Sequence, residues 1–444
     1  MEKSTRIDKK KLAMSLFCSM LAVPTAADAS VVTDGNGVAI DKHPQTGNYE
    51  ISPDFFNGKV GFKKFQDLEL SKGDIMNFIF QAYKLDGQIK YDPNTGAVVG
   101  SSNTHWDSVD TFVNFVNSQI NINGTVNALS SFATLQNAAL KTDGNLVFVS
   151  PQGMIVGSSG VLNVGSLNVY TPTQAQFDSY FNSIGTADRN SFTGVSYADK
   201  TNLTFDGSSM TTGNAPITIN GKVIARGDIG LHGSDVNITQ ASGASTGGFL
   251  LAGVGGDATV LTGESAANTL FNTLVNADNM VSGSGFANAN GKIVITSTSG
   301  TNVGANSAVK NYAMNGSVDV TNTGSKGITV NGEISNANGT MNLTNKAGAI
   351  NQGANGEILN KGTMNITNSN SGTGITLNGL VENSGDMNIT NASGSNGLNI
   401  GGDVTNNTGA MNIHNQKGTL NVSSSGVVTS NGTSLDMENS GVGG

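Results

Sequence analysis

The chain has 444 residues, only 12% of them charged, with 59 glycines and a formal net charge of −9. An acidic balance with no basic stripe excludes a nucleic-acid-binding surface, so no nucleic-acid partner is expected. Long stretches in which Val, Ile, Leu and Met alternate with polar residues favour half-buried β-strands over disorder.

The N-terminal segment has the pattern of a secretory signal peptide. A basic stretch, MEKSTRIDKKK, precedes the apolar run Leu12–Val23, which is too short to span a membrane. The motif Ala27-Asp28-Ala29 predicts cleavage between Ala29 and Ser30, so residues 1–29 are expected to be removed. Cys18 is the only cysteine, and the mature chain must therefore be held together without disulfides.

Three segments have apolar residues at helical spacing and are predicted to be short helices on the outside of the molecule. In the first, His105-Trp106-Asp107 is expected to begin a helix with a buried tryptophan. The segments are WDSVDTFVNFVNS (106–118), QAQFDSYF (174–181) and SAANTLFNTLVNADNM (265–280).

Residues 144–173, GNLVFVSPQGMIVGSSGVLNVGSLNVYTPT, contain two apolar runs separated only by Ser150-Pro151-Gln152-Gly153. Ser at the first position, Pro at the second and Gly at the fourth are the preferences of a type I turn. We therefore expect Ser150–Gly153 to turn a corner between two buried strands.

The second half of the chain repeats with a period of 23 or 24 residues, and each repeat carries three apolar positions. The repeated motif reads MNLTN, MNITN or a close variant, and its methionines are predicted to stack inside the molecule. The first column is Val318, Met341, Met364, Met387, Met411 and Leu435; the second is Ile328, Ile350, Ile375, Leu398 and Leu420; the third is Ile334, Ile358, Val381, Val404 and Val427.

Each repeat is predicted to form three short strands, and one repeat alone cannot bury its apolar face. Stacked repeats bury one continuous core. The predicted fold is therefore all-β: a right-handed parallel β-helix, or solenoid, with an N-terminal cap and a few short peripheral helices. A β-propeller has longer repeats, and a sandwich would not keep this register.

Three segments together resemble the secretion domain of two-partner-secretion exoproteins of the filamentous haemagglutinin type. They are the turn segment at 144–173, GFKKFQDLELSKGDIMNFIF from Gly61, and FVNFVNSQININGTVNAL. The Ser-Pro-x-Gly-Met wording, then Gly-Ser-Leu and Thr-Pro-Thr, is closest to the leukotoxin-type filamentous adhesins. The resemblance covers Val31–Ile238. Ser150 and Gln152 stand where that family has two asparagines.

This resemblance implies an exported protein whose N-terminal domain is recognised by a separate outer-membrane transporter in a Gram-negative-type bacterium. The chain would thread out unfolded and coil at the surface as a secreted or surface-exposed adhesin that binds a host cell or another bacterial surface. The expected organisation is a secretion domain at 30–240, irregular coils with a helical insertion at 241–292, and the repetitive β-helix at 293–444.

Arg226-Gly227-Asp228, within VIARGDIGLHG, matches an integrin-binding tripeptide, which some adhesins of this type carry. In the alternative interpretation, the tripeptide only closes one coil and opens the next. Receptor binding requires Asp228 at an exposed loop tip.

An enzyme, a cofactor and a metal site are not expected. Enzymes on parallel β-helices need clustered carboxylates on one face, but no aspartate column recurs at the repeat period. The histidines have no i, i+4 pairing for zinc; they are His43, His105, His232 and His414.

Two other functions compete with the adhesin. A cytolysin exported by the same route would lyse red cells, whereas an adhesin would not. A purely structural filament predicts neither lysis nor saturable binding to cells.

Overall fold

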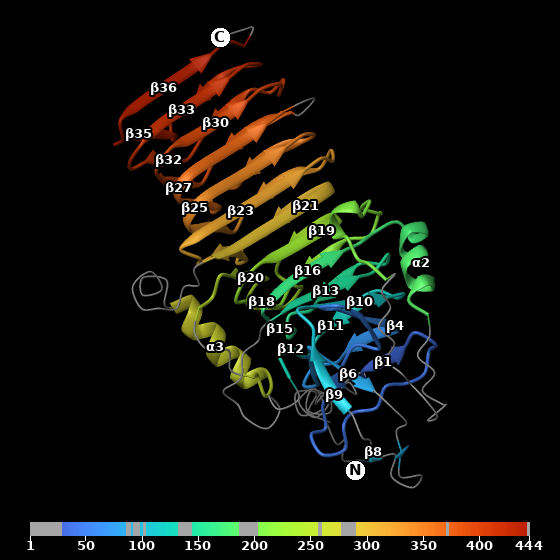
Figure 1. The fold of residues 1–444 in the computed structure, drawn as a ribbon. Coiled ribbons are helices and arrows are strands. Elements are labelled where there is room, and N and C mark those ends of the chain that lie inside the picture. Colours follow the sequence, from blue (N-terminus) through green and yellow to red (C-terminus); the bar gives the residue numbers. More distant parts are fainter. Residues whose placement is uncertain are drawn as a thin grey trace, which may run out of the picture.

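The computed structural model describes residues 29–85, 90–91, 98–100, 104–131, 144–185, 203–255, 260–276, 290–369 and 373–441. Within these ranges the protein is all-β, as predicted. The strands stack along one long axis from the N-terminal to the C-terminal end (Figure 1). The helical elements described are α2 (Gln174–Ser183), α3 (Glu264–Asn276) and the short 3-10 turn η2 (Gly207–Ser209).

The stacked strands form three parallel ladders, and we call one passage of the chain through all three a rung. The first ladder runs through the longest strands. These are β4 (Val60–Leu70), β10 (Thr111–Val116), β13 (Asn145–Val149), β16 (Ser166–Tyr170), β19 (Ile229–Ile238), β21 (Asn290–Val303), β23 (Asn315–Asn322), β25 (Glu333–Asn345), β27 (Glu357–Asn368), β30 (Met387–Asn391), β33 (Ala410–Asn415) and β36 (Ser434–Asn439).

The second ladder joins the ends of β4, β19 and β21 to a series of short strands. These are β11 (Ile120–Ile122), β14 (Met154–Val156), β17 (Ile217–Ile219), β24 (Gly327–Val330), β26 (Ala349–Gln352), β28 (Gly374–Leu377), β31 (Leu398–Ile400) and β34 (Leu420–Val422).

The third ladder includes the first residues of β25 and β27, which bend from it into the first ladder. Its other strands are β2 (Tyr49–Ile51), β5 (Ile75–Ile79), β12 (Thr125–Leu129), β15 (Val161–Val164), β18 (Lys222–Ala225), β20 (Phe249–Ala252), β22 (Ala308–Asn311), β29 (Leu380–Ser384), β32 (Asp403–Asn406) and β35 (Val427–Ser430).

The N-terminal end of the stack is covered by antiparallel strands, whereas at the other end β34, β35 and β36 are the last described strands of their ladders. Strands β1 (Val31–Asp34) and β3 (Phe55–Asn57) both pair antiparallel with β4. Two further antiparallel pairs lie beside the stack: β6 (Gln81–Leu85) with β9 (Thr104–Ser108), and β7 (Lys90–Tyr91) with β8 (Val98–Gly100). In the last rung, the inward position Leu435 remains 48% exposed.

The predicted apolar columns are confirmed apart from one position, because the first-ladder strands from β23 to β33 bury alternate residues and adjacent rungs are in register. Met341 pairs with Met364, Met364 with Met387, and Met387 with Met411, all fully buried. One continuous core extends from Val32 to Ile413.

The prediction was wrong for one residue of the third column, Val427. Val404 pairs with Val428, and Val427 pairs with Asp403. Because successive side chains on a strand point to opposite faces, a shift of one residue moves the side chain out of the core. Val427 is accordingly 50% exposed, whereas Val428 packs against the core.

Two of the three predicted helices are confirmed, one as α2 and one as α3 over residues 265–276; residues 277–280 of the latter prediction lie outside the described ranges. The prediction for residues 106–118 was wrong, since this segment forms the end of β9 and all of β10. Phe112 and Val116 face the main core, whereas Val113 and Phe115 face a second cluster under α2. A strand buried on both faces has consecutive apolar residues, and their spacing imitated a helix.

From β23 onward, each first-ladder strand ends in an asparagine, and these asparagines form a largely buried hydrogen-bond ladder that was not predicted from the sequence. Each side-chain amide donates to the Oδ1 atom of the asparagine one rung further on, over distances of 2.7–2.9 Å. The ladder comprises Asn322, Asn345, Asn368, Asn391, Asn415 and Asn439. Its only sequence signal was the last letter of each repeated motif.

Candidate functional site

The turn Ser150–Gly153 lies where the chain passes from β13 in the first ladder to β14 in the second. The Gly153 amide donates to the Ser150 carbonyl oxygen at 3.3 Å, which closes the predicted turn. Gly153 has a φ of 89°. A β-carbon there would collide with the carbonyl oxygen of Pro216 in the next rung. Glycine is therefore required at this corner.

The two ends of the turn are fixed, and its middle faces solvent. Ser150 is 1% exposed. Its Oγ donates to the Ser118 carbonyl oxygen at 2.8 Å and accepts from the Gln152 amide at 3.1 Å. Pro151 is half-buried and the Gln152 side chain is exposed. A partner can therefore contact Pro151 and Gln152, whereas Ser150 and Gly153 serve the backbone.

Ser150 makes the same kind of local bond as the asparagines at this corner of later rungs. The Asn322 Oδ1 accepts from the Gly324 amide two residues on, at 3.2 Å, just as the Ser150 Oγ accepts from Gln152. Short polar side chains commonly stabilise turns in this way. The Ser150 hydroxyl thus accepts the same local bond that an asparagine accepts at this corner in a later rung.

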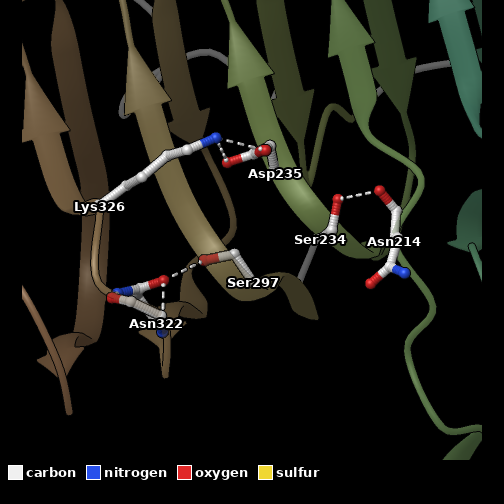
Figure 2. Close-up of polar contacts among 7 residues, drawn as sticks. Asn214, Ser234, Asp235, Ser297, Asn322 and Lys326 are labelled. Atoms are coloured by element: carbon white, nitrogen blue, oxygen red, sulfur yellow. Dashed lines mark hydrogen bonds and ion pairs between the residues drawn. The ribbon is translucent and has the colours of Figure 1, made fainter.

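Buried hydroxyl groups continue along this corner between the turn and the asparagine ladder. Figure 2 shows the Ser234 Oγ donating to the Asn214 carbonyl oxygen at 2.8 Å and the Ser297 Oγ donating to the Asn322 Oδ1 at 2.9 Å. One rung before Ser234, the Thr171 Oγ1 donates to the Ala215 carbonyl oxygen at 3.0 Å. The corner is polar and hydrogen-bonded through the stack, which suits a structural role.

Figure 2 also shows an ion pair that joins two rungs across a third. The Lys326 Nζ lies 2.8 Å from an Asp235 carboxylate oxygen. Gly300 is in register with Asp235 on one side and with Gly327, the residue after Lys326, on the other. A β-carbon at Gly300 would lie 2.7 Å from the Lys326 Cβ. The Lys326 side chain is 65% exposed, so this pair contributes little to stability.

The Arg226-Gly227-Asp228 tripeptide forms the short connection between β18 and β19. Asp228 is exposed, but its amide donates to the Ser166 Oγ at 2.9 Å and its carboxylate accepts from the Lys292 amide at 2.8 Å. Burial lowers the pKa of Arg226. These contacts join neighbouring rungs and favour the structural interpretation; receptor binding stays a prediction.

A half-buried aromatic stack of Tyr170 and His232 lies beside the corner, and Tyr170 also packs against the cluster that α2 covers. The His232 and Tyr170 rings are parallel, with centroids 4.7 Å apart and an interplanar angle of 8°. Burial lowers the pKa of His232 to about 4. Burial, followed by the nearby Asp206 carboxylate, raises the pKa of Tyr170. Both groups are therefore neutral at pH 7.

A groove on the third-ladder side, which we call the Tyr312 groove, was not foreseen from the sequence. It has a volume of about 780 Å³ and crosses β22, β25, β27 and β29. Tyr312 lies at one end and also packs in the cluster beneath α3. Its lining includes Lys310, Met314, Glu333, Ser335, Glu357, Leu359, Lys361 and Glu382.

The remaining sequence predictions involve the leader and possible metal ligands. Residues 1–28 lie outside the described ranges, but the predicted first mature residue, Ser30, is anchored: its Oγ donates to the Asp74 carboxylate at 2.6 Å. Among the residues described, no group of three or more His, Cys, Asp or Glu side chains is placed to hold a metal ion. None of the described helices has the length and apolar character needed to cross a membrane.

No protein-family model, curated protein or solved structure matches the chain.

Proposed function

We propose that the chain is a right-handed parallel β-helix and acts as a secreted or surface-exposed filamentous adhesin. A separate outer-membrane transporter recognises residues 30–240 and exports the chain. The stacked rungs then face a host cell or another bacterial surface. The three parallel ladders, which repeat every 23 or 24 residues over the regular rungs, support this fold.

The observation that carries the proposed function is the Ser150–Gly153 turn. Its sequence resembles a secretion motif, and its geometry separates two tasks. Ser150 and Gly153 fix the backbone of the corner between β13 and β14. Pro151 and Gln152 lie at the surface of the same corner. In the proposed mechanism the transporter contacts Pro151 and Gln152 at this corner, and the later rungs fold after export.

Secretion in the presence and absence of the transporter tests the export route. Mature wild-type protein is expected in the medium only when the transporter is coexpressed. The Pro151→Ala/Gly153→Val variant is expected to lose most secretion, and the Pro151→Ala/Gln152→Ala variant, which leaves the fixed ends intact, is expected to lose part of it. Release without the transporter would refute the proposed route.

A control separates recognition from folding. Gly397 also has a positive φ, of 73°, and a β-carbon there would collide with the Thr419 carbonyl oxygen in the next rung. Gly397→Val therefore imposes a comparable local clash outside residues 30–240. The proposal requires this variant to reach the medium, and equal loss from both glycine variants would contradict transporter recognition of the turn.

The purified protein provides the test of adhesion. We expect saturable binding to host or bacterial cells without lysis of red cells. Lysis of red cells would indicate a cytolysin and contradict the adhesin. The absence of both binding and lysis would indicate a structural filament.

A further inference from the structure

We infer that the Tyr312 groove binds a neutral, extended oligosaccharide. This inference names a ligand class for the proposed adhesin, and its biological meaning rests on that proposed function.

The groove follows from a sharp bend of the backbone between the third and first ladders. Gly339, Gly362 and Gly385 stack at this bend and have φ values of 100°, 139° and 148°. A β-carbon at any of them would collide with the carbonyl oxygen of the stacked glycine one rung earlier. Because the same bend recurs from rung to rung, the groove runs along the stack and exists before any ligand arrives.

Polar and apolar side chains alternate along this groove at the strand spacing. Ser335, Leu359 and Glu382 are in register on three successive strands, and Glu333 is in register with Glu357. Adjacent strands lie about 4.8 Å apart, a distance comparable with the length of one pyranose ring. A chain of sugar rings along the stack would therefore meet one row of side chains per ring.

The lining has the two kinds of surface that a sugar ring needs. Leu359 is half-buried and Met314 is 54% exposed, so both offer apolar surface to the C–H face of a ring. Glu357, Glu382 and Ser335 supply hydrogen-bonding groups for ring hydroxyls. A few placed polar groups over an apolar floor are typical of small-molecule sites.

The charges of the groove favour a neutral ligand. The Lys310 Nζ lies 2.8 Å from the Glu333 carboxylate, and this pair is largely buried. The Glu382 Oε1 accepts from the Asn407 amide at 2.7 Å. Glu357 is exposed, with no ion pair among the described residues. With Lys361, the lining holds three carboxylates and two ammonium groups, which disfavours sulfated or carboxylated glycans.

The strand pairing disfavours an extended peptide as the occupant. A peptide that adds to a sheet needs an open edge. Each of β22, β25, β27 and β29 is paired on both sides within the third ladder. The groove therefore offers side chains to a ligand, and no free backbone row.

Titration calorimetry on the purified mature chain tests the inference. The probes are cellohexaose, maltohexaose and N-acetylchitohexaose, with a heparin hexasaccharide as the anionic comparison. We expect saturable binding of at least one neutral probe and none of heparin. Failure of all three neutral probes to bind at millimolar concentration, or tighter binding of heparin, would overturn the inference.

Matched variants locate the binding. Glu357→Gln/Glu382→Gln is expected to weaken binding at least tenfold. Asp403→Asn serves as the control, because Asp403 is exposed and stacks next to Leu380 in the same ladder but lies outside the groove. Equal effects of both changes, with matched thermal unfolding, would exclude the groove as the site.

The outcomes also separate this inference from the proposed function. If secretion depends on the transporter and the protein binds cells but no oligosaccharide, only the assignment of the groove is refuted. Oligosaccharide binding that depends on Glu357 and Glu382, in a protein that does not attach to cells, would refute the adhesin and leave the groove assigned.

Discussion

Acidification is expected to destabilise the protein through His232, and His232→Phe should remove much of this effect. Burial against Tyr170 disfavours the charged imidazole, so the folded-state pKa is about 4, compared with about 6.5 in an unfolded chain. As the pH falls below 6.5, the unfolded state takes up the proton first. The stabilisation is therefore fully present above pH 6.5 and is lost as the pH falls toward 4.

The size of the effect follows from the difference between the two pKa values. A difference of about 2.5 pKa units corresponds to about 3 kcal/mol of unfolding free energy between pH 7 and pH 4. Phenylalanine keeps a flat ring against Tyr170 and cannot take up a proton. The variant should therefore lose about 3 kcal/mol less than the wild type over this pH range.

Hydrogen exchange is the suitable assay, because a long stack need not unfold in one step. The Thr171 amide donates to the His232 carbonyl oxygen at 3.0 Å and reports on local opening. Its protection should fall between pH 7 and pH 4 in the wild type, beyond the intrinsic change in exchange rate, and fall less in His232→Phe. Parallel loss of protection in both proteins would refute the assigned role of His232.

Two further predictions concern the regular rungs. Asn368→Ala should lower the free energy of unfolding by about 1–3 kcal/mol, because it leaves the Asn345 amide and the Asn391 Oδ1 without their ladder partners in the core. Guanidinium unfolding should show a much smaller loss for Asn388→Ala, at a half-buried position. Equal losses would contradict a stabilising role for the buried ladder. Met364→Ala should lower the free energy of unfolding by about 2–5 kcal/mol, because it leaves a cavity in the core. The control Met314→Ala, at a side chain that is 54% exposed, should keep the thermal unfolding temperature of the wild type. An unchanged unfolding temperature for Met364→Ala would indicate that the methionine column is loosely packed.

The apolar columns were predictable because their period equals the length of one rung. Once Met341, Met364 and Met387 recur every 23 residues, stacking follows from the need to bury them. The helix expected at residues 106–118 failed because Phe115 is buried under α2, a segment distant in sequence. Periodicity within one strand carries no information about what covers its outer face.

The asparagine ladder and the groove were missed for different reasons. The asparagines were visible in every repeated motif. A polar residue at a corner is nevertheless expected to be exposed to solvent, unless its hydrogen-bond partner in the next rung is known. The groove depends on the bend at Gly339 and Gly362, whose consequence appears only when successive rungs are superposed. The Ser150–Gly153 turn, by contrast, could be read locally, since each residue matches its position in the turn.

The register of the ladders has a consequence for how such a gene can change length. The motif MNITN occurs identically at 364–368 and 387–391, and the two copies occupy the same place in consecutive rungs. Unequal recombination between these copies would remove or duplicate one whole rung. Met341 would then stack on the next methionine, and Asn345 on the next asparagine. Homologous genes could thus differ by whole multiples of the repeat without a change in the core.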